Sequence, residues 1–286
     1  LGGPHQGWPV PLATDIAFAL AVFAMVGRGL PTSLRIFLLT LAIVDDLGAI
    51  ALIAVLFSQG VQWPPLILVA GLLIAGGVLA RFRKIPSPFW VLGFAAVWGL
   101  TVQAGLSTSL TAVAFAAIVP IRARAEDRQS PLREAMHDLH LYVAFLILPL
   151  FAFAKAGVAF GGLALEQLVA PLVLGIALGL FIGKQVGVFG FAWLAARTGW
   201  GARPSGASWA QVYGVSLLCG VGFTMSLFIG ALAFPGAADS PVQAEVKLGV
   251  LGGSLLSALA GAAVLALARR ASRKDLAETA PDTVAK

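Results

Sequence analysis

Long runs of apolar residues, separated by short polar or basic turns, follow one another along almost the whole chain. Several runs exceed the roughly 18 residues that mark a helix able to span a bilayer. The pattern predicts nine spans, of which the first and fifth are short for a full crossing. Their ranges are Ala13–Val26, Leu34–Phe57, Pro65–Ala80, Phe89–Leu106, Leu110–Ile121, Leu141–Val158, Leu168–Leu194, Val212–Phe234 and Val246–Ala268. The Arg122–His140 segment is expected to be the one long polar loop.

Basic residues fall in alternate loops of this pattern. Most of the 19 lysine and arginine residues follow the odd-numbered spans, and the exceptions are Lys155, Lys184 and Lys247. Because cytoplasmic loops carry the excess of Lys and Arg, these loops and the 269–286 tail are predicted to be cytoplasmic. The first span then enters the membrane from outside with no signal peptide before it. We therefore expect the natural protein to contain an odd number of further spans upstream, so that residues 1–286 form one membrane domain truncated at its N-terminus.

Composition supports the membrane assignment. Hydrophobic residues make up 59% of the chain and charged residues only 11%, against about 25% charged residues in soluble domains. This excludes a soluble enzyme. The net charge of +6 is explained by the cytoplasmic loops, so no nucleic-acid partner is expected. The single Cys219 excludes a disulfide framework within the chain and a cysteine-based metal cluster.

Four charged residues lie inside predicted spans and carry the functional argument: Asp15, Asp45, Asp46 and Lys184. Each charge at bilayer depth costs at least about 2.5–3.5 kcal/mol, so such residues usually serve ion or proton pathways. The structural alternative is a buried ion pair that only holds helices together. Snorkelling to the interface is a further alternative for Lys184.

The adjacent carboxylates argue for more than an ion pair. Neighbouring side chains on a helix point about 100° apart, so Lys184 cannot neutralise both Asp45 and Asp46 well. Two close carboxylates titrate as a coupled pair, which allows proton exchange near neutral pH. Hard cations such as Na⁺ favour the same oxygen ligands. The pair therefore predicts competition between Na⁺ and protons for one site.

Glycines surround Lys184 in a regular pattern. Gly175, Gly179, Gly183 and Gly187 recur every four residues, and such stripes let another helix approach closely. We therefore expect Lys184 to lie against a packed neighbouring helix rather than to snorkel.

The eighth span contains a poor helix-forming stretch, Cys219–Ser226. Gly220, Gly222 and Thr224 lie within it, and the pattern predicts local unwinding. A glycine-rich packing face is the alternative. The first span is short, begins at two prolines and bears Asp15, so it is expected to be broken too. Paired interrupted spans of opposite direction indicate an inverted-repeat transporter with its site at the midplane.

Several motifs together resemble the bacterial NhaA sodium/proton antiporters, and the resemblance runs over nearly the whole chain. They are Ala13-Thr14-Asp15-Ile16-Ala17-Phe18-Ala19-Leu20, Ile43-Val44-Asp45-Asp46-Leu47-Gly48-Ala49-Ile50, Leu148-Pro149-Leu150-Phe151-Ala152-Phe153-Ala154, Gly183-Lys184 and Gly222-Phe223-Thr224-Met225-Ser226. The resemblance implies an all-α integral membrane protein of the bacterial inner membrane, with twelve spans of which this chain holds the fourth to the twelfth. It implies electrogenic, pH-regulated export of Na⁺ and Li⁺ against external protons, no cofactor, and a homodimer formed through the upstream region.

The resemblance also implies roles for matched residues. Asp46 resembles the main Na⁺, Li⁺ and proton-binding carboxylate, and Asp45 its partner, which pairs with Lys184 in one state. Thr14 resembles a further cation ligand. Asp15 and Lys184 resemble residues that compensate the helix ends where the broken spans cross.

The chain departs from the family pattern at two places. Ser107 stands where a histidine linked to pH response is usual, and Lys155 stands where asparagine is usual. In the loosely matching cytoplasmic stretch, Glu134, His137 and His140 are candidates for pH sensing. The alternative for the two histidines is that they are ordinary solvated side chains.

Three other kinds of membrane protein fit the sequence less well. A Na⁺-coupled solute symporter needs a roomier and more polar site than the sequence offers. A channel does not need a lysine facing paired carboxylates, and the lysine would repel cations. A structural or chaperone-like membrane protein would not carry Asp45, Asp46 and Lys184 at mid-membrane depth.

Overall fold

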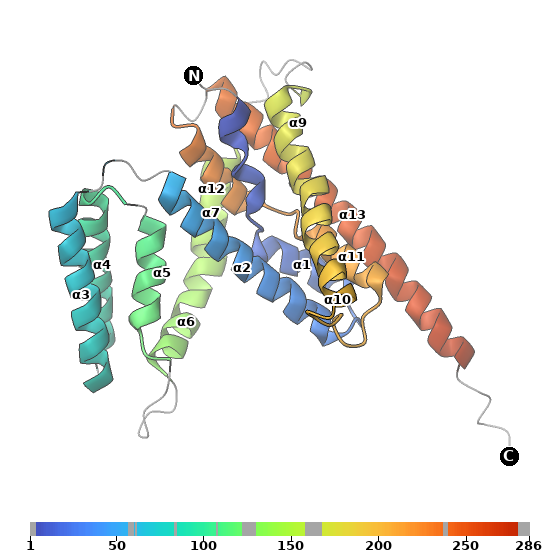
Figure 1. Cartoon of the computed structure of the whole chain (residues 1–286), viewed down its shortest axis with the longest axis horizontal. Helices are drawn as coiled ribbons and strands as arrows, with labels where there is room; N and C mark the ends of the chain where they lie inside the picture. Colours follow the sequence, from blue (N-terminus) through green and yellow to red (C-terminus); the bar gives the residue numbers. More distant parts are fainter. Residues whose placement is uncertain are drawn as a thin grey trace. The chain divides into compact units, whose positions relative to one another are not determined.

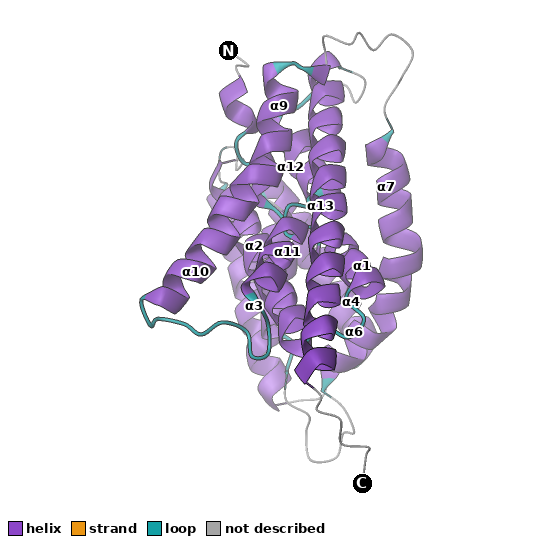
Figure 2. Ribbon diagram, turned by 90° about the vertical axis from the view of Figure 1, so that its right-hand side faces the viewer, coloured by secondary structure: helices purple, strands orange, loops and turns teal. Residues whose placement is uncertain are grey.

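The structure is a computed structural model, and it describes residues 4–56, 60, 62–82, 85–106, 108–121, 130–157, 168–236 and 240–279. Within these ranges all regular structure is helical (Figures 1 and 2). The elements are η1 (Pro4–Gly7), η2 (Val10–Leu12), α1 (Ile16–Val26), α2 (Thr32–Leu56), α3 (Trp63–Phe82), α4 (Ser87–Gln103), α5 (Thr108–Ile118), α6 (Pro131–Tyr142), η3 (Val143–Ile147), α7 (Leu148–Ala156), α9 (Pro171–Leu178), η4 (Gly179–Gly183), η5 (Gln185–Phe189), α10 (Gly190–Arg197), α11 (Trp209–Leu218), α12 (Phe223–Ala233) and α13 (Pro241–Thr279).

The chain is a multi-pass membrane protein. Within the described ranges, five continuous helices are long and apolar enough to cross a bilayer: Thr32–Leu56, Trp63–Phe82, Pro131–Ala156, Pro171–Arg197 and Pro241–Ala271. Helices α11 and α12 form a sixth candidate, bent by 45° at a short break. Three shorter apolar helices cover Val10–Val26, Pro88–Gln103 and Thr108–Ile118. These short segments correspond to the predicted first, fourth and fifth spans.

Contacts divide the chain into two compact units, Leu1–Ala49 with Ala154–Lys286, and Ile50–Phe153. In the first unit, α13 packs along α11, α9 and α12. Glycines permit the closest approaches: a Cβ added at Gly253 would lie 2.9 Å from the Ala177 Cα of α9, and one at Gly214 would lie 2.7 Å from the Leu265 side chain. Close backbone approach at small residues is the usual way that membrane helices associate.

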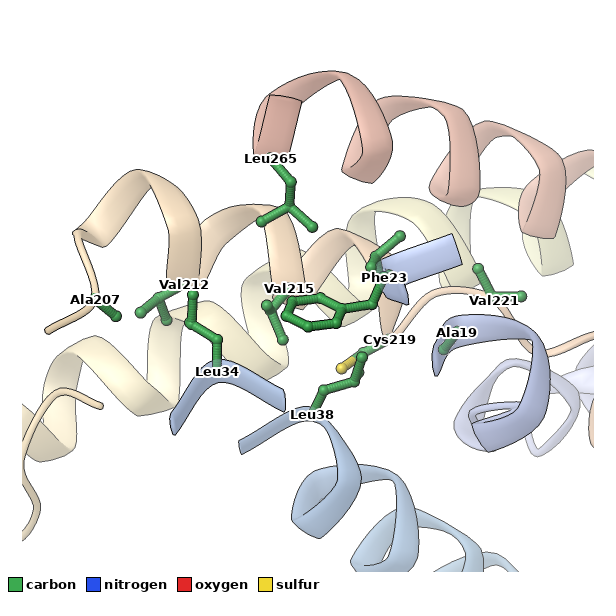
Figure 3. Close-up of a cluster of buried hydrophobic side chains, with 11 residues drawn as sticks. Ala19, Phe23, Leu34, Leu38, Ala207, Val212, Val215, Cys219, Val221 and Leu265 are labelled. Atoms are coloured by element: carbon green, nitrogen blue, oxygen red, sulfur yellow. The ribbon is translucent and has the colours of Figure 1, made fainter. Parts of the chain in front are cut away.

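The core of the first unit is an apolar cluster between α1, α2, α11 and α13 (Figure 3). Phe23 of α1, Leu34 and Leu38 of α2, Val215 of α11 and Leu265 of α13 meet there. Dense packing of this kind resists displacement, so it fixes the ends of the segments that carry the charged residues.

The second unit contains α3, α4 and α5, which pack pairwise. The Phe115 ring of α5 makes edge contacts with Trp90 and Phe94 of α4 at centroid distances of 5.8 and 5.4 Å. Ile118 of α5 fills the space above Gly76 and Gly77 of α3. These contacts are apolar and stabilise helix packing.

The predicted Arg122–His140 loop is wrong in its second half, which forms α6. Ser130 accepts a hydrogen bond from the Arg133 N–H, Pro131 occupies the first turn, and Glu134 is acidic in that turn. These are standard features of a helix N-terminus. Helix α6 continues through η3 into α7 as one long candidate span, Pro131–Ala156.

Candidate functional site

Two non-helical stretches, Ala13–Asp15 and Cys219–Gly222, meet in the first unit, and together they are called the crossing below. Ala13 and Asp15 are extended, with ψ of 149° and 101°. Cys219–Gly222 separates α11 from α12. The Asp15 N–H donates to the Val221 carbonyl at 2.6 Å, so each break satisfies backbone groups of the other.

Asp15 binds the N-termini of two helices. Its carboxylate accepts hydrogen bonds from the Phe18 N–H of α1 at 3.1 Å and from the Thr224 N–H of α12 at 3.0 Å. The Thr224 hydroxyl also donates to it at 2.5 Å. The side chain is buried, with 2% of the residue exposed. A negative charge at this point interacts favourably with the positive ends of both helix dipoles.

The C-terminal ends of helical segments at the crossing carry carbonyl groups, and two other side chains donate hydrogen bonds to them. Lys184 donates from Nζ to the Leu12 carbonyl at the end of η2, at 2.5 Å. The Thr14 hydroxyl is 2.8 Å from the Cys219 carbonyl at the end of α11. The crossing thus places a carboxylate at helix N-termini and donors at helix C-termini.

Lys184, Asp45 and Thr14 form one cluster. Lys184 Nζ makes an ion pair with Asp45 Oδ2 and donates to Thr14 Oγ1 at 3.1 Å. Thr14 Oγ1 is also 2.8 Å from Asp45 Oδ2. A threonine hydroxyl has a single proton, so at any moment it donates either to Asp45 or to the Cys219 carbonyl. The cluster can therefore rearrange its protons without moving heavy atoms.

Asp46 follows Asp45 on α2 but stands outside that cluster. Its Oδ1 is buried and accepts no hydrogen bond within the part of the chain that the structure describes. A buried carboxylate oxygen without a donor is costly, and it suits a proton or a cation as a partner.

The helix that carries Lys184 runs from Pro171 to Arg197. Its regularly spaced glycines do not form the predicted contact surface for a neighbouring helix. An added Cβ at Gly179 would lie 2.8 Å from Pro11, whereas one at Gly175, Gly183 or Gly187 would meet no atom of the described residues within 4 Å. The neighbour at Gly179 is the proline-rich segment before Thr14, not a helix. Periodicity alone does not reveal which face of a helix is covered.

Gly183 and Gly187 instead line a cleft of about 690 Å³. Asp45 and Lys184 are the charged residues of its lining, and most other lining side chains are apolar. Much of the cleft lies along the end of α2 that contains Arg35 and the end of α10 that contains Arg197. The lining residues there are Phe37, Leu41, Phe191 and Ala192.

The glycines of the crossing are required by close contacts. A Cβ at Gly220 would lie 2.4 Å from the Leu180 carbonyl, and one at Gly222 would lie 2.1 Å from Ser226 Oγ. Sequence reasoning missed Ser254 of α13, whose hydroxyl accepts from the Gly222 and Phe223 N–H groups at 3.2 Å each. Its only sequence signal is a hydroxyl residue among the glycines of an apolar helix.

The proposed pH-sensing residues belong to the second unit. Glu134, His137 and His140 lie on α6 with exposed side chains. Lys155 is exposed in the last turn of α7, and Ser107 lies outside the described residues. The structure thus unites Thr14, Asp45 and Lys184, and separately Asp15 and Thr224.

Comparison with known proteins gives a consistent result. Residues 2–265 match the family model described as Na⁺/H⁺ antiporter 1. The chain is 52% identical over 265 residues to a Na⁺/H⁺ antiporter NhaA of Bordetella parapertussis, covering 91% of this chain and 66% of the relative. It is 49% identical over 278 residues to one of Caulobacter vibrioides, covering 94% and 66%. A Klebsiella pneumoniae relative named NhaA 2 is 46% identical over 263 residues, covering 91% and 67%.

Proposed function

Because this chain belongs to the Na⁺/H⁺ antiporter 1 family, we propose that it carries the ion-exchange site of an antiporter that moves Na⁺ out of a bacterial cell in exchange for protons. The chain spans 66% of the length of the Bordetella and Caulobacter relatives. The proposed activity is therefore that of the whole protein to which these spans belong, and we propose that this protein lies in the bacterial inner membrane.

One observation carries the proposal: a lysine-bound carboxylate lies next in sequence to a second carboxylate with a buried, unpartnered oxygen. Lys184 holds Asp45, and within the described residues Asp46 Oδ1 has no hydrogen-bond partner. Na⁺ favours carboxylate and hydroxyl oxygens, which Asp45, Asp46 and Thr14 supply. Na⁺ must then compete with protons at Asp46 and with the lysine at Asp45.

This competition yields antiport. A protonated Asp46 cannot offer a full charge to Na⁺, so arrival of the cation requires departure of the proton. Binding of Na⁺ also weakens the hold of Lys184 on Asp45. Release of Na⁺ on the other face restores both the proton and the ion pair. If two titrating groups change state per cation, the cycle moves net charge and is electrogenic. Li⁺ uses the same oxygens.

The crossing supports an inverted-repeat architecture. Within the described residues there are up to six candidate spans and three shorter apolar helices, and we propose that each of the shorter helices also belongs to a span. Asp15 connects the Ala13–Asp15 break with the α11–α12 break, because its carboxylate accepts hydrogen bonds at the N-termini of both α1 and α12. In this proposal Asp15 and Lys184 compensate the helix ends at the bilayer midplane, and the C-terminus is cytoplasmic.

A pH-regulated cycle follows from the same competition, because protons displace Na⁺ when they are abundant. Glu134, His137 and His140 on α6 are proposed to add to this response. Dimer formation through the upstream region also remains part of the proposal.

The test uses the full-length protein in everted membrane vesicles. A fluorescent dye reports the collapse of a pH gradient when Na⁺, Li⁺ or K⁺ is added. Na⁺ and Li⁺ should collapse the gradient and K⁺ should not. Asp46→Asn should abolish the response, because it removes a cation ligand charge and a proton site together. A normal Na⁺ response in well-expressed Asp46→Asn protein would refute the proposal.

A further inference from the structure

The helix that carries Lys184 is irregular at that residue. Two π-helical segments, η4 and η5, meet at Lys184. Wide turns of this kind are rare and are often found at functional sites. They change the rotation of the residues that follow. Here Lys184 must direct one ammonium group to acceptors on two other segments, Leu12, Thr14 and Asp45.

The side chain of Gln185 stabilises this irregular turn. Its Nε2 donates to the Phe181 carbonyl at 2.9 Å. That oxygen is the one which the backbone N–H of residue 185 would bind in a regular α-helix. The side chain can therefore serve the carbonyl while the backbone follows the wider turn, directly beside Lys184.

A neighbouring helix fixes the Gln185 side chain. The Tyr213 hydroxyl of α11 donates to Gln185 Oε1 at 2.5 Å. An amide that donates through its nitrogen and accepts through its oxygen is held in one orientation. The Tyr213 ring also contacts Phe189 at 5.3 Å between centroids, and Phe189 contacts Trp209 at 6.0 Å. Helix α11 thus holds η5 at two points one turn apart.

Helix α11 is itself well anchored. Its first turn is closed by a capping box between Ser208 and Gln211, and its last residues lead to the Cys219 carbonyl beside Thr14. Figure 3 shows Val212 and Val215 of α11 inside the apolar cluster. The Tyr213–Gln185 bond therefore links the Lys184 segment to a helix that is buried in the apolar cluster.

We infer that Gln185 and Tyr213 are positioning residues that hold Lys184 on Asp45 and thereby set how readily Na⁺ displaces the lysine. This inference rests on the proposed antiport function. When the tyrosine hydroxyl is removed, the Gln185 side chain loses its hydrogen bond to α11, and only the ring contacts of Phe189 still connect η5 to that helix. The lysine then competes less well for Asp45, and Na⁺ binds at lower concentration.

The decisive variant is Tyr213→Phe, which keeps the ring contacts and removes only the hydroxyl. In everted vesicles at one alkaline pH, the Na⁺ concentration for half-maximal response should fall about threefold, the equivalent of an average side-chain hydrogen bond between membrane helices. The maximal response per amount of transporter should not change. Gln185→Leu should lower the same concentration, and combining both substitutions should add nothing.

Thr198→Val is the matched control. The Thr198 hydroxyl also bonds a carbonyl of its own helix, Leu194 at 2.9 Å, but it lies beyond the last turn of α10, more than three turns from Lys184. Its half-maximal Na⁺ concentration should equal that of the parent. If Tyr213→Phe accumulates poorly, Na⁺-dependent thermal stabilisation of purified Gln185→Leu protein gives the same comparison.

Two results would overturn the inference. One is an unchanged or raised half-maximal Na⁺ concentration in Tyr213→Phe. The other is an effect confined to the maximal response and proportional to the amount of folded protein. Asp46→Asn, measured in the same vesicles, distinguishes this failure from failure of the proposed function. If Asp46→Asn gives no Na⁺ response while Tyr213→Phe has the half-maximal Na⁺ concentration of the parent, only the positioning role is rejected.

Discussion

The crossing in the first unit and helix α6 in the second both carry charged side chains in a largely apolar chain, but they hold them in opposite ways. Asp15 is buried and accepts three hydrogen bonds from two helices. Helix α6 has no buried residue, and its charged groups are exposed. A polar group that has exchanged water for fixed protein partners is costly to change, whereas a solvated one is not. The contrast predicts where substitutions act on transport and where they do not.

Asp15→Ala should have the largest effect. It removes one acceptor from two helix N-termini and leaves the Thr224 hydroxyl without its bond. Hydrogen bonds to charged groups are worth about 1.5–3 kcal/mol each and are not additive, so we expect a loss of about 4 kcal/mol in the free energy of unfolding. Thermal unfolding of detergent-purified protein, followed by tryptophan fluorescence, measures it.

The matched control for Asp15 lies in α6. Ser130 caps that helix through one bond to the Arg133 N–H at 3.4 Å, so Ser130→Ala should cost only about 1 kcal/mol. Equal losses in the two variants would mean that the crossing is no more strongly held than an ordinary helix end.

Substitution of Lys184 should have the next largest effect and should separate two roles. Lys184→Ala leaves Asp45 unpaired, and we expect a loss of about 3 kcal/mol, the low end for a buried pair, because the Asp45 side chain is 25% exposed. Lys184→Arg should keep measurable antiport with an alkaline-shifted profile and lose less stability. Dye-based vesicle assays and thermal unfolding measure the two quantities.

The arginine variant also decides whether the lysine carries a proton. Arginine stays protonated above about pH 12, so it can replace a fixed counter-charge but not a proton carrier. Well-folded Lys184→Arg protein that binds Na⁺ yet shows no transport at any pH would make Lys184 a carrier.

Gly220→Ala should have an intermediate effect. The added Cβ would lie 2.4 Å from the Leu180 carbonyl, a backbone atom that cannot rotate away. Overpacking typically costs about 1–3 kcal/mol, and we expect about 2 kcal/mol with reduced transport. In Gly99→Ala of α4 the added Cβ meets no atom within 4 Å in the part of the chain that the structure describes, so this variant should be neutral or slightly stabilising in the same unfolding experiment. A tolerated Gly220→Ala would show that the crossing can relax.

The sequence alone predicts most of the apolar helices of the structure, and it identifies Asp15, Asp45 and Lys184 as charged residues within apolar runs. The length of an apolar run indicates whether a helix can cross the bilayer, and a charged residue within such a run is easily recognised. The poor helix formers at Cys219–Gly222 likewise mark the break between α11 and α12. These features are local, so they can be read from a single sequence.

The partners of the site residues could not be predicted in the same way. Leu12 and Cys219 act through backbone carbonyls, which every residue possesses, and Ser254 reaches Gly222 from 32 positions away in sequence. The glycine stripe beside Lys184 was misinterpreted because spacing does not say which neighbour, if any, covers a helix face. Helix α6 could have been found, since Ser130 and Pro131 form a recognisable N-terminal signal.

The histidines of α6 should give the smallest effect. The double variant His137→Gln, His140→Gln changes two exposed side chains, and solvent and salt screen the electrostatic influence of exposed groups. We therefore expect the pH of half-maximal response in the vesicle assay to move by less than about half a unit. Glu134→Gln, one turn before His137, is the control for replacing a single exposed side chain of the same helix. A shift of about one unit in the histidine variant alone would show that α6 senses pH, because solvated and screened charges cannot produce it. The exposed helix α6 would then affect transport as strongly as the buried crossing. Exposure of a side chain would no longer predict whether its substitution changes transport in this protein.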